Sequence, residues 1–79
     1  MVEAKKNSVR AELRRARRVA GLTMTRLARN LRVTPSAVSA WEAGIRKPSD
    51  SIIPDLADEL AVPAATLLDW IDRPATTPN

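Results

Sequence analysis

The chain has to fold without a covalent or metal staple, because its 79 residues include neither cysteine nor histidine. A β-sheet protein of this length seldom buries enough apolar surface to be stable without such staples. Packed helices bury more of a short chain, and the helix-favouring residues Ala, Leu and Arg are plentiful. The sequence therefore predicts a single small all-α domain.

The absence of cysteine and histidine also limits the kinds of catalytic and metal site that the chain can form. Without thiol or imidazole groups, the chain has no ligands for the usual zinc site, no cysteine nucleophile and no histidine general base. We therefore expect no enzyme, no metal and no other cofactor. No apolar signal segment follows Lys5 and Lys6, and no run of about 18 apolar residues occurs, so we expect a cytoplasmic protein without a membrane partner.

Charge is divided unevenly along the chain. Residues 1–47 contain 12 basic and 3 acidic residues, a net charge of +9, whereas residues 48–79 contain 1 basic and 6 acidic residues, a net charge of −5. A domain with this division would turn its basic side toward a polyanion such as nucleic acid. Solubilising charge spread over helix surfaces explains the same counts equally well.

Apolar periodicity and helix-end signals predict five helices, which would make a compact bundle. We expect a flexible basic arm over residues 1–7, a folded domain over residues 8–72 and a disordered tail over residues 73–79. Asn7 or Ser8 can cap the first helix. The expected helices span about residues 8–20, 24–31, 35–44, 53–60 and 64–71.

Capping signals place the second and third helices close together. Thr23 and Thr34 can each accept a hydrogen bond from a free backbone N–H group at a helix start. Pro35 suits a first helical position, because its missing N–H would have no partner there. Ala28 is small enough to let the two helices approach closely, so the segment is predicted to be a helix-turn-helix.

Several short motifs are more specific than this helical pattern. They are Gly21-Leu22-Thr23, Leu27-Ala28, Leu31, Val33-Thr34, Val38-Ser39, Trp41-Glu42-Ala43-Gly44, Lys47-Pro48-Ser49 and residues 56–62. Over residues 9–71 the chain thereby resembles the phage-repressor type of helix-turn-helix protein, the XRE-like or Cro/cI group. The resemblance implies a lambda-repressor-like DNA-binding domain whose third helix enters the major groove of double-stranded DNA.

The resemblance also implies two sets of DNA-binding residues. The base-facing set, on the third helix and its cap, is Thr34, Pro35, Ser36, Ala37, Ser39 and Ala40. The phosphate-binding set, at the start of the second helix and in the loop after the third, is Thr23, Met24, Arg26, Arg46 and Lys47. Small side chains offer few hydrogen bonds to bases, so either groove shape contributes to recognition or part of the base-facing set is only a solvent-facing helix surface.

Two positions depart from the family pattern. Met24 stands where glutamine is common, and a thioether cannot make the same polar contact. Arg32 stands where a turn glycine is usual, which should cost about 1 kcal/mol if the backbone there is left-handed.

The remaining assignments are structural. The resemblance implies that Arg17 and Glu42 form an ion pair, while apolar neighbours at helical spacing predict that Trp41 lies in the core. Trp70 either completes the core or lies exposed beside Leu67 and Ile71, and we take these three residues as candidates for a dimer contact.

Two functions remain open on the sequence alone. The first is a sequence-specific transcription regulator, expected to be a repressor, that binds a roughly palindromic operator as a homodimer. The second is an antitoxin-like or adaptor module, whose acidic C-terminal part binds a basic protein partner such as a toxin. The two differ in whether the chain discriminates between DNA sequences.

Overall fold

The computed structural model describes residues 10–72 of the chain. Its elements are α2 (Ala11–Val19), α3 (Met24–Leu31), α4 (Pro35–Ala43), the 3₁₀ helix η1 (Asp50–Ile52), α5 (Ile53–Leu60) and α6 (Ala64–Asp72). No strand occurs in this part of the chain, and the predicted all-α helix-turn-helix fold is confirmed. The predicted basic arm, the disordered tail and the cap at Asn7 or Ser8 lie outside the described residues.

The starts of α3 and α4 follow directly from their cap residues. The Thr23 hydroxyl accepts a hydrogen bond of 3.0 Å from the backbone N–H of Arg26. The Thr34 hydroxyl accepts one of 3.1 Å from the backbone N–H of Ala37, and Pro35 occupies the first turn of α4. Both predicted caps are confirmed, and each satisfies a donor that would otherwise lack a helical partner.

Left-handed residues end four of the helical segments. Gly21 after α2 and Gly44 after α4 have φ of 76° and 79°, which glycine adopts without steric cost. Arg32 after α3 has φ of 61°, so the left-handed backbone on which its predicted cost depends is present. Ala61 after α5 has φ of 58°, which the sequence did not predict because alanine normally favours the right-handed region.

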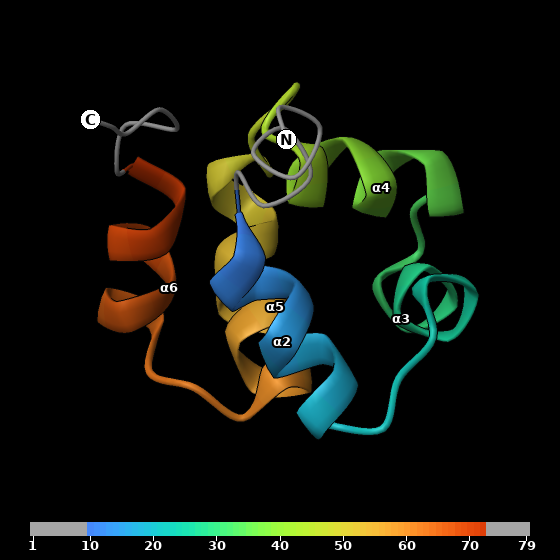
Figure 1. Cartoon of the computed structure of the whole chain (residues 1–79), viewed down its shortest axis with the longest axis horizontal. Helices are drawn as coiled ribbons and strands as arrows, with labels where there is room; N and C mark the ends of the chain where they lie inside the picture. The colour runs from blue at the N-terminus through green and yellow to red at the C-terminus, as the bar shows by residue number, and fades with distance from the viewer. Residues whose placement is uncertain (1–9, 73–79) are drawn as a thin grey trace, which may run out of the picture.

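The helices enclose one apolar core. Figure 1 shows α3 and α4 at one end of the molecule and α6 at the other, with α2 and α5 between them. Leu13, Leu27, Leu56 and Leu67 are fully buried at the centre of this arrangement. Trp41 is 4 % exposed, so its predicted place in the core is confirmed.

Two features of the second half of the chain differ from the sequence expectation. The 3₁₀ helix η1 precedes α5, because the backbone N–H of Ile52 donates to the Ser49 carbonyl. α5 then begins at Ile53, with Pro54 in its first turn. On α6, Leu67 and Ile71 are buried by their own chain, which leaves these two side chains little surface for the predicted dimer contact. Trp70 is half-buried against the edge of the core.

Among residues 10–72, no helix is long and apolar enough to cross a membrane.

The left-handed alanine gives a direct stability test. Ala61→Gly should raise the free energy of unfolding by about 0.5–1 kcal/mol, because glycine relieves the Cβ strain at φ 58° but adds some entropy to the unfolded chain. Chemical denaturation of the purified chain measures the change. Ala65→Gly, an exposed alanine within α6, is the matched control and should instead lower stability. Equal losses from both substitutions would contradict this account.

Candidate nucleic-acid interface

The outer face of α4 carries most of the base-facing set. Thr34, Pro35, Ser36 and Ser39 are exposed, and the rest of the described chain does not cover them. Ala37 and Ala40 are half-buried. Ala37 also packs against the core, so its methyl group serves the interior of the domain as well as the surface. The set therefore lies together, but its outermost groups are two hydroxymethyl side chains, a threonine and a proline ring.

The phosphate-binding set divides between the start of α3 and the segment after α4. Thr23, Arg26, Arg46 and Lys47 are all exposed. Met24 is half-buried and packs against the core, so its side chain serves packing rather than a phosphate. The first turn of α3 still presents free backbone N–H groups, which carry partial positive charge toward an anion.

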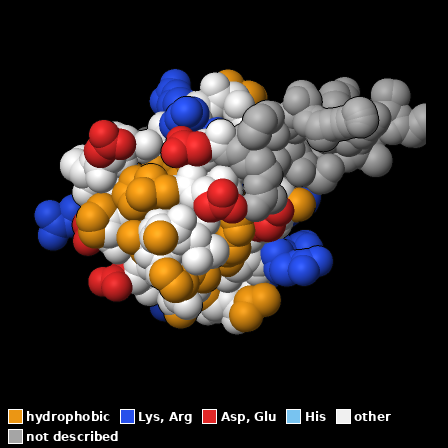
Figure 2. Space-filling view, turned by 90° about the vertical axis from the view of Figure 1, so that its left-hand side faces the viewer, with side chains coloured by type: hydrophobic (Ala, Val, Ile, Leu, Met, Phe, Trp, Pro, Cys, Tyr) orange, Lys and Arg blue, Asp and Glu red, His pale blue; other side chains and the backbone are white. Residues whose placement is uncertain are grey.

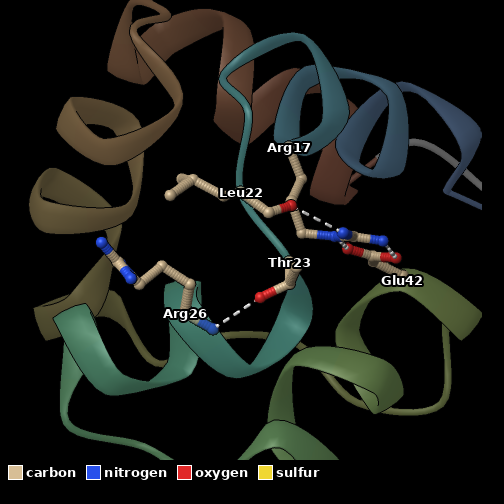
Figure 3. Close-up of polar contacts among 5 residues, drawn as sticks. All are labelled: Arg17, Leu22, Thr23, Arg26 and Glu42. Carbon is tan, nitrogen blue, oxygen red and sulfur yellow. Dashed lines mark hydrogen bonds and ion pairs between the residues drawn. The ribbon is translucent and has the colours of Figure 1, made fainter.

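A buried ion pair fixes α2, α3 and α4 relative to one another. Arg17 donates from Nε to Oε2 of Glu42 at 2.6 Å and from Nη2 to Oε1 at 3.3 Å. Its Nη1 donates to the Leu22 carbonyl at 2.9 Å, immediately before the cap residue Thr23. Figure 3 shows the guanidinium held between that carbonyl and the carboxylate, while the Arg26 side chain points away from the pair. The two residues implied as a pair by the resemblance are thus in bidentate contact.

Arg10, the residue before α2, is a second buried guanidinium. It is 7 % exposed and donates to the carbonyls of Trp41, Arg46 and Ile71. Burial lowers the pKa of Arg10 from its ordinary value, and the nearby Asp72 carboxylate opposes that shift. The sequence gives no signal for these contacts, because the acceptors are backbone carbonyls, which every residue type has.

The surface around α3 and α4 is basic. From Thr23 to Lys47 the sole carboxylate is Glu42, and it is buried against Arg17. The carboxylates of the second half of the chain belong to η1, α5 and α6. Figure 2 looks onto the α6 end and shows hydrophobic side chains gathered there among Asp and Glu side chains. The described carboxylates after Lys47 therefore belong to elements other than α3 and α4, although Figure 2 also shows Lys and Arg side chains at the edges of the α6 face.

Two carboxylates of the acidic half lie against the surface around α3 and α4. Glu59 of α5 accepts a hydrogen bond of 2.8 Å from Nδ2 of Asn30 on α3. Asp72, at the end of α6, lies 3.6 Å from the Lys47 ammonium, and both side chains are about two-thirds exposed, at 67 % and 64 %. An exposed pair of this kind is weak and is screened by salt.

Within the described residues, no group of three or more His, Cys, Asp or Glu side chains is placed so that it could hold a metal ion. The arrangement is suited to binding a polyanion along α4.

Comparison with protein-family models matches residues 13–67 to the helix-turn-helix family. The match covers α2 through the first part of α6, and so includes both DNA-binding sets. Searches of curated proteins and of solved structures gave no match.

The buried ion pair should behave very differently from the exposed one. Arg17→Met should lower the free energy of unfolding by about 3–5 kcal/mol, because it leaves the Glu42 carboxylate buried without a partner. Lys47→Met, which removes the exposed pair with Asp72, is the control and should change stability by less than about 1 kcal/mol. Chemical denaturation measures both. Similar small losses from the two variants would show that Arg17 does not fix the helices.

Proposed function

Because the chain belongs to the helix-turn-helix family of DNA-binding transcription regulators, we propose that it places α4 in the major groove of double-stranded DNA, as a homodimer acting as a repressor. The observation that carries this proposal is the exposed outer face of α4, set in a surface without an exposed carboxylate from Thr23 to Lys47. An α-helix fits the major groove. Carboxylates beside the helix would repel the phosphate backbone, and residues 23–47 expose none.

Base recognition in the proposed complex uses small groups. Ser36 and Ser39 offer hydroxyls that both donate and accept hydrogen bonds to base edges. Pro35 and Ala40 offer apolar surface to thymine methyl groups. Such side chains allow α4 to approach the floor of the groove closely, so the shape of the DNA contributes to selection as well.

Phosphate contacts supply most of the proposed affinity. Two segments carry the proposed phosphate contacts. The capped start of α3 at Thr23 comes before α4 in the sequence, and Arg46 and Lys47 come after it. Contacts on both sides of a groove fix the depth and register of the helix between them. Each phosphate neutralised by a cation releases counterions, which makes binding strongly salt-dependent.

Dimerisation would bring two copies of α4 to half-sites about 34 Å apart, one turn of the DNA helix. The α6 face offers apolar surface for such a contact, because Leu68 is 41 % exposed and Trp70 is half-buried; Val19 and Ile45 are exposed apolar side chains elsewhere on the domain. A dimer on a promoter would block transcription by occupying it.

One observation favours the adaptor function as a second candidate. The α6 end combines exposed apolar side chains with Asp and Glu, which suits a basic protein partner as well as a second copy of the chain (Figure 2). The two functions make different predictions for DNA. A regulator should prefer some duplexes by roughly a thousandfold over others, whereas an adaptor should not discriminate.

Removal of the two cations after α4 tests the phosphate contacts. Arg46→Ala combined with Lys47→Ala should weaken binding to all duplexes alike and flatten the log–log dependence on salt by about two units. Fluorescence titration of a labelled duplex at several salt concentrations measures this. Arg14→Ala with Arg18→Ala, exposed on α2 and outside both sets, removes the same charge and should leave the slope nearly unchanged. Equal slopes for the two double variants would exclude this segment as a phosphate contact.

Selection of bound duplexes from a random pool tests base reading and the dimer together. The wild-type chain should yield a motif with two half-sites one helical turn apart. Ser36→Ala and Ser39→Ala should each alter base preference within a half-site, because each removes a hydroxyl from the outer face of α4. Ser51→Ala, an exposed serine of η1, is the control and should return the wild-type motif.

Three results of that selection would count against the proposal. An unchanged motif for both α4 variants would mean that these hydroxyls do not read bases. A motif with one half-site would contradict the homodimer. A pool without enrichment would contradict sequence-specific binding and favour the adaptor function.

A further inference from the structure

Arg10 belongs to neither DNA-binding set, yet it is bonded to the backbone that carries one of them. Its Nη1 donates to the Arg46 carbonyl at 2.9 Å and to the Trp41 carbonyl at 2.7 Å. Its Nη2 donates to the Ile71 carbonyl at 3.4 Å. One side chain therefore joins the last turn of α4, the segment after it and the last turn of α6.

The acceptors lie at or just after helix ends, where carbonyls have few partners from the helical ladder. Trp41 and Ile71 are in the last turns of α4 and α6. The Trp41 carbonyl also accepts a bond of 3.2 Å from the Gly44 N–H, so Arg10 is a second donor to it. A cation there also lies at the negative ends of two helix dipoles. A guanidinium offers several N–H groups in one plane, so it can bond to carbonyls from different segments at once, which a single ammonium does less well.

The segment after α4 is held from both sides. Its backbone N–H groups at Ile45 and Arg46 donate to the Ala40 carbonyl at 3.0 and 3.3 Å. Its carbonyl at Arg46 accepts from the buried Arg10. With the peptide bonded inward in this way, the Arg46 and Lys47 side chains are left exposed. The segment is thus ordered before any ligand arrives.

We propose that Arg10 is a positioning residue for DNA binding: it holds residues 45–47 in the conformation from which Arg46 and Lys47 contact phosphates, and it ties that conformation to the end of α6. This inference rests on the proposed function. Preordering matters because a loop that is ordered only on binding loses part of its contact energy to entropy. Since Arg10 is buried, it acts through this segment and not by touching the DNA.

Hydrogen exchange in the absence of DNA tests the hold on the segment. In the full chain, Arg10→Met should speed exchange of the Ile45 and Arg46 amides roughly tenfold or more, while core amides such as Leu27 and Leu56 keep their rates. Arg10→Lys keeps the charge but lacks the planar fork, so it should restore part of the protection. Arg14→Met, exposed on α2, is the matched control and should change none of these rates. Uniform acceleration of all amides in both Arg10 variants would overturn the proposal, because Arg10 would then support only the fold as a whole.

A double-mutant cycle tests the connection to phosphate binding. Arg10→Met should weaken duplex binding roughly tenfold and flatten its salt dependence, but should cause no further loss when Arg46 and Lys47 are already alanine. If Arg10→Met does not fold, Arg10→Lys takes its place with a smaller expected loss. The same fold-loss in both backgrounds would overturn the proposal.

The proposed function and this inference fail in different ways. A wild-type chain that binds no duplex overturns DNA binding itself, and the phosphate role of Arg10 with it. Normal wild-type binding that Arg10→Met leaves unchanged overturns the inference alone. The exchange experiment decides independently whether Arg10 holds residues 45–47.

Discussion

The arrangement of α2, α3 and α4 depends on the buried contact between Arg17 and Glu42. Removing two charges from water is costly, and their attraction offsets that cost only while the geometry is good. Here the carboxylate takes two donors from the guanidinium, and a third donor satisfies the Leu22 carbonyl. Any shift of α4 against α2 would leave a buried charge unpaired. The pair therefore acts mainly by excluding other arrangements of the helices, rather than by adding stability to this one.

Arg10 extends the same principle to the other end of α4. Both arginines lie on the α2 side of the domain, and both bond to backbone carbonyls as well as being buried. Arg17 fixes the chain just before α3 begins, whereas Arg10 fixes the segment that follows α4. The two segments that carry the phosphate-binding set are thus each anchored to α2 by a buried guanidinium. Arg14, Arg15 and Arg18 on the same helix are exposed instead.

Local signals in the sequence predicted the parts of the fold that local chemistry determines. Thr23, Thr34 and Pro35 placed the starts of α3 and α4, because a cap acts within one turn. Arg10 could not be found in this way, since its three carbonyl acceptors lie 31, 36 and 61 residues away and any residue type can supply them. The same limit explains α6: the spacing of its apolar residues marks a helix, but only packing shows that Leu67 is buried and Leu68 exposed.

The long-range contacts of Arg10 and Arg17 also bear on how the proposed complex would select its DNA sequence. The outer face of α4 carries small side chains with few hydrogen-bonding groups, so direct base contacts give only part of the discrimination. Phosphate contacts carry sequence information only when their spacing is rigid, because a rigid pair requires the DNA to adopt one groove shape. A flexible loop would follow any duplex and discriminate little. In the proposed complex, the buried guanidinium groups of Arg10 and Arg17 would therefore support specificity as well as affinity, by preventing the two phosphate-binding segments from adjusting to the wrong sequence.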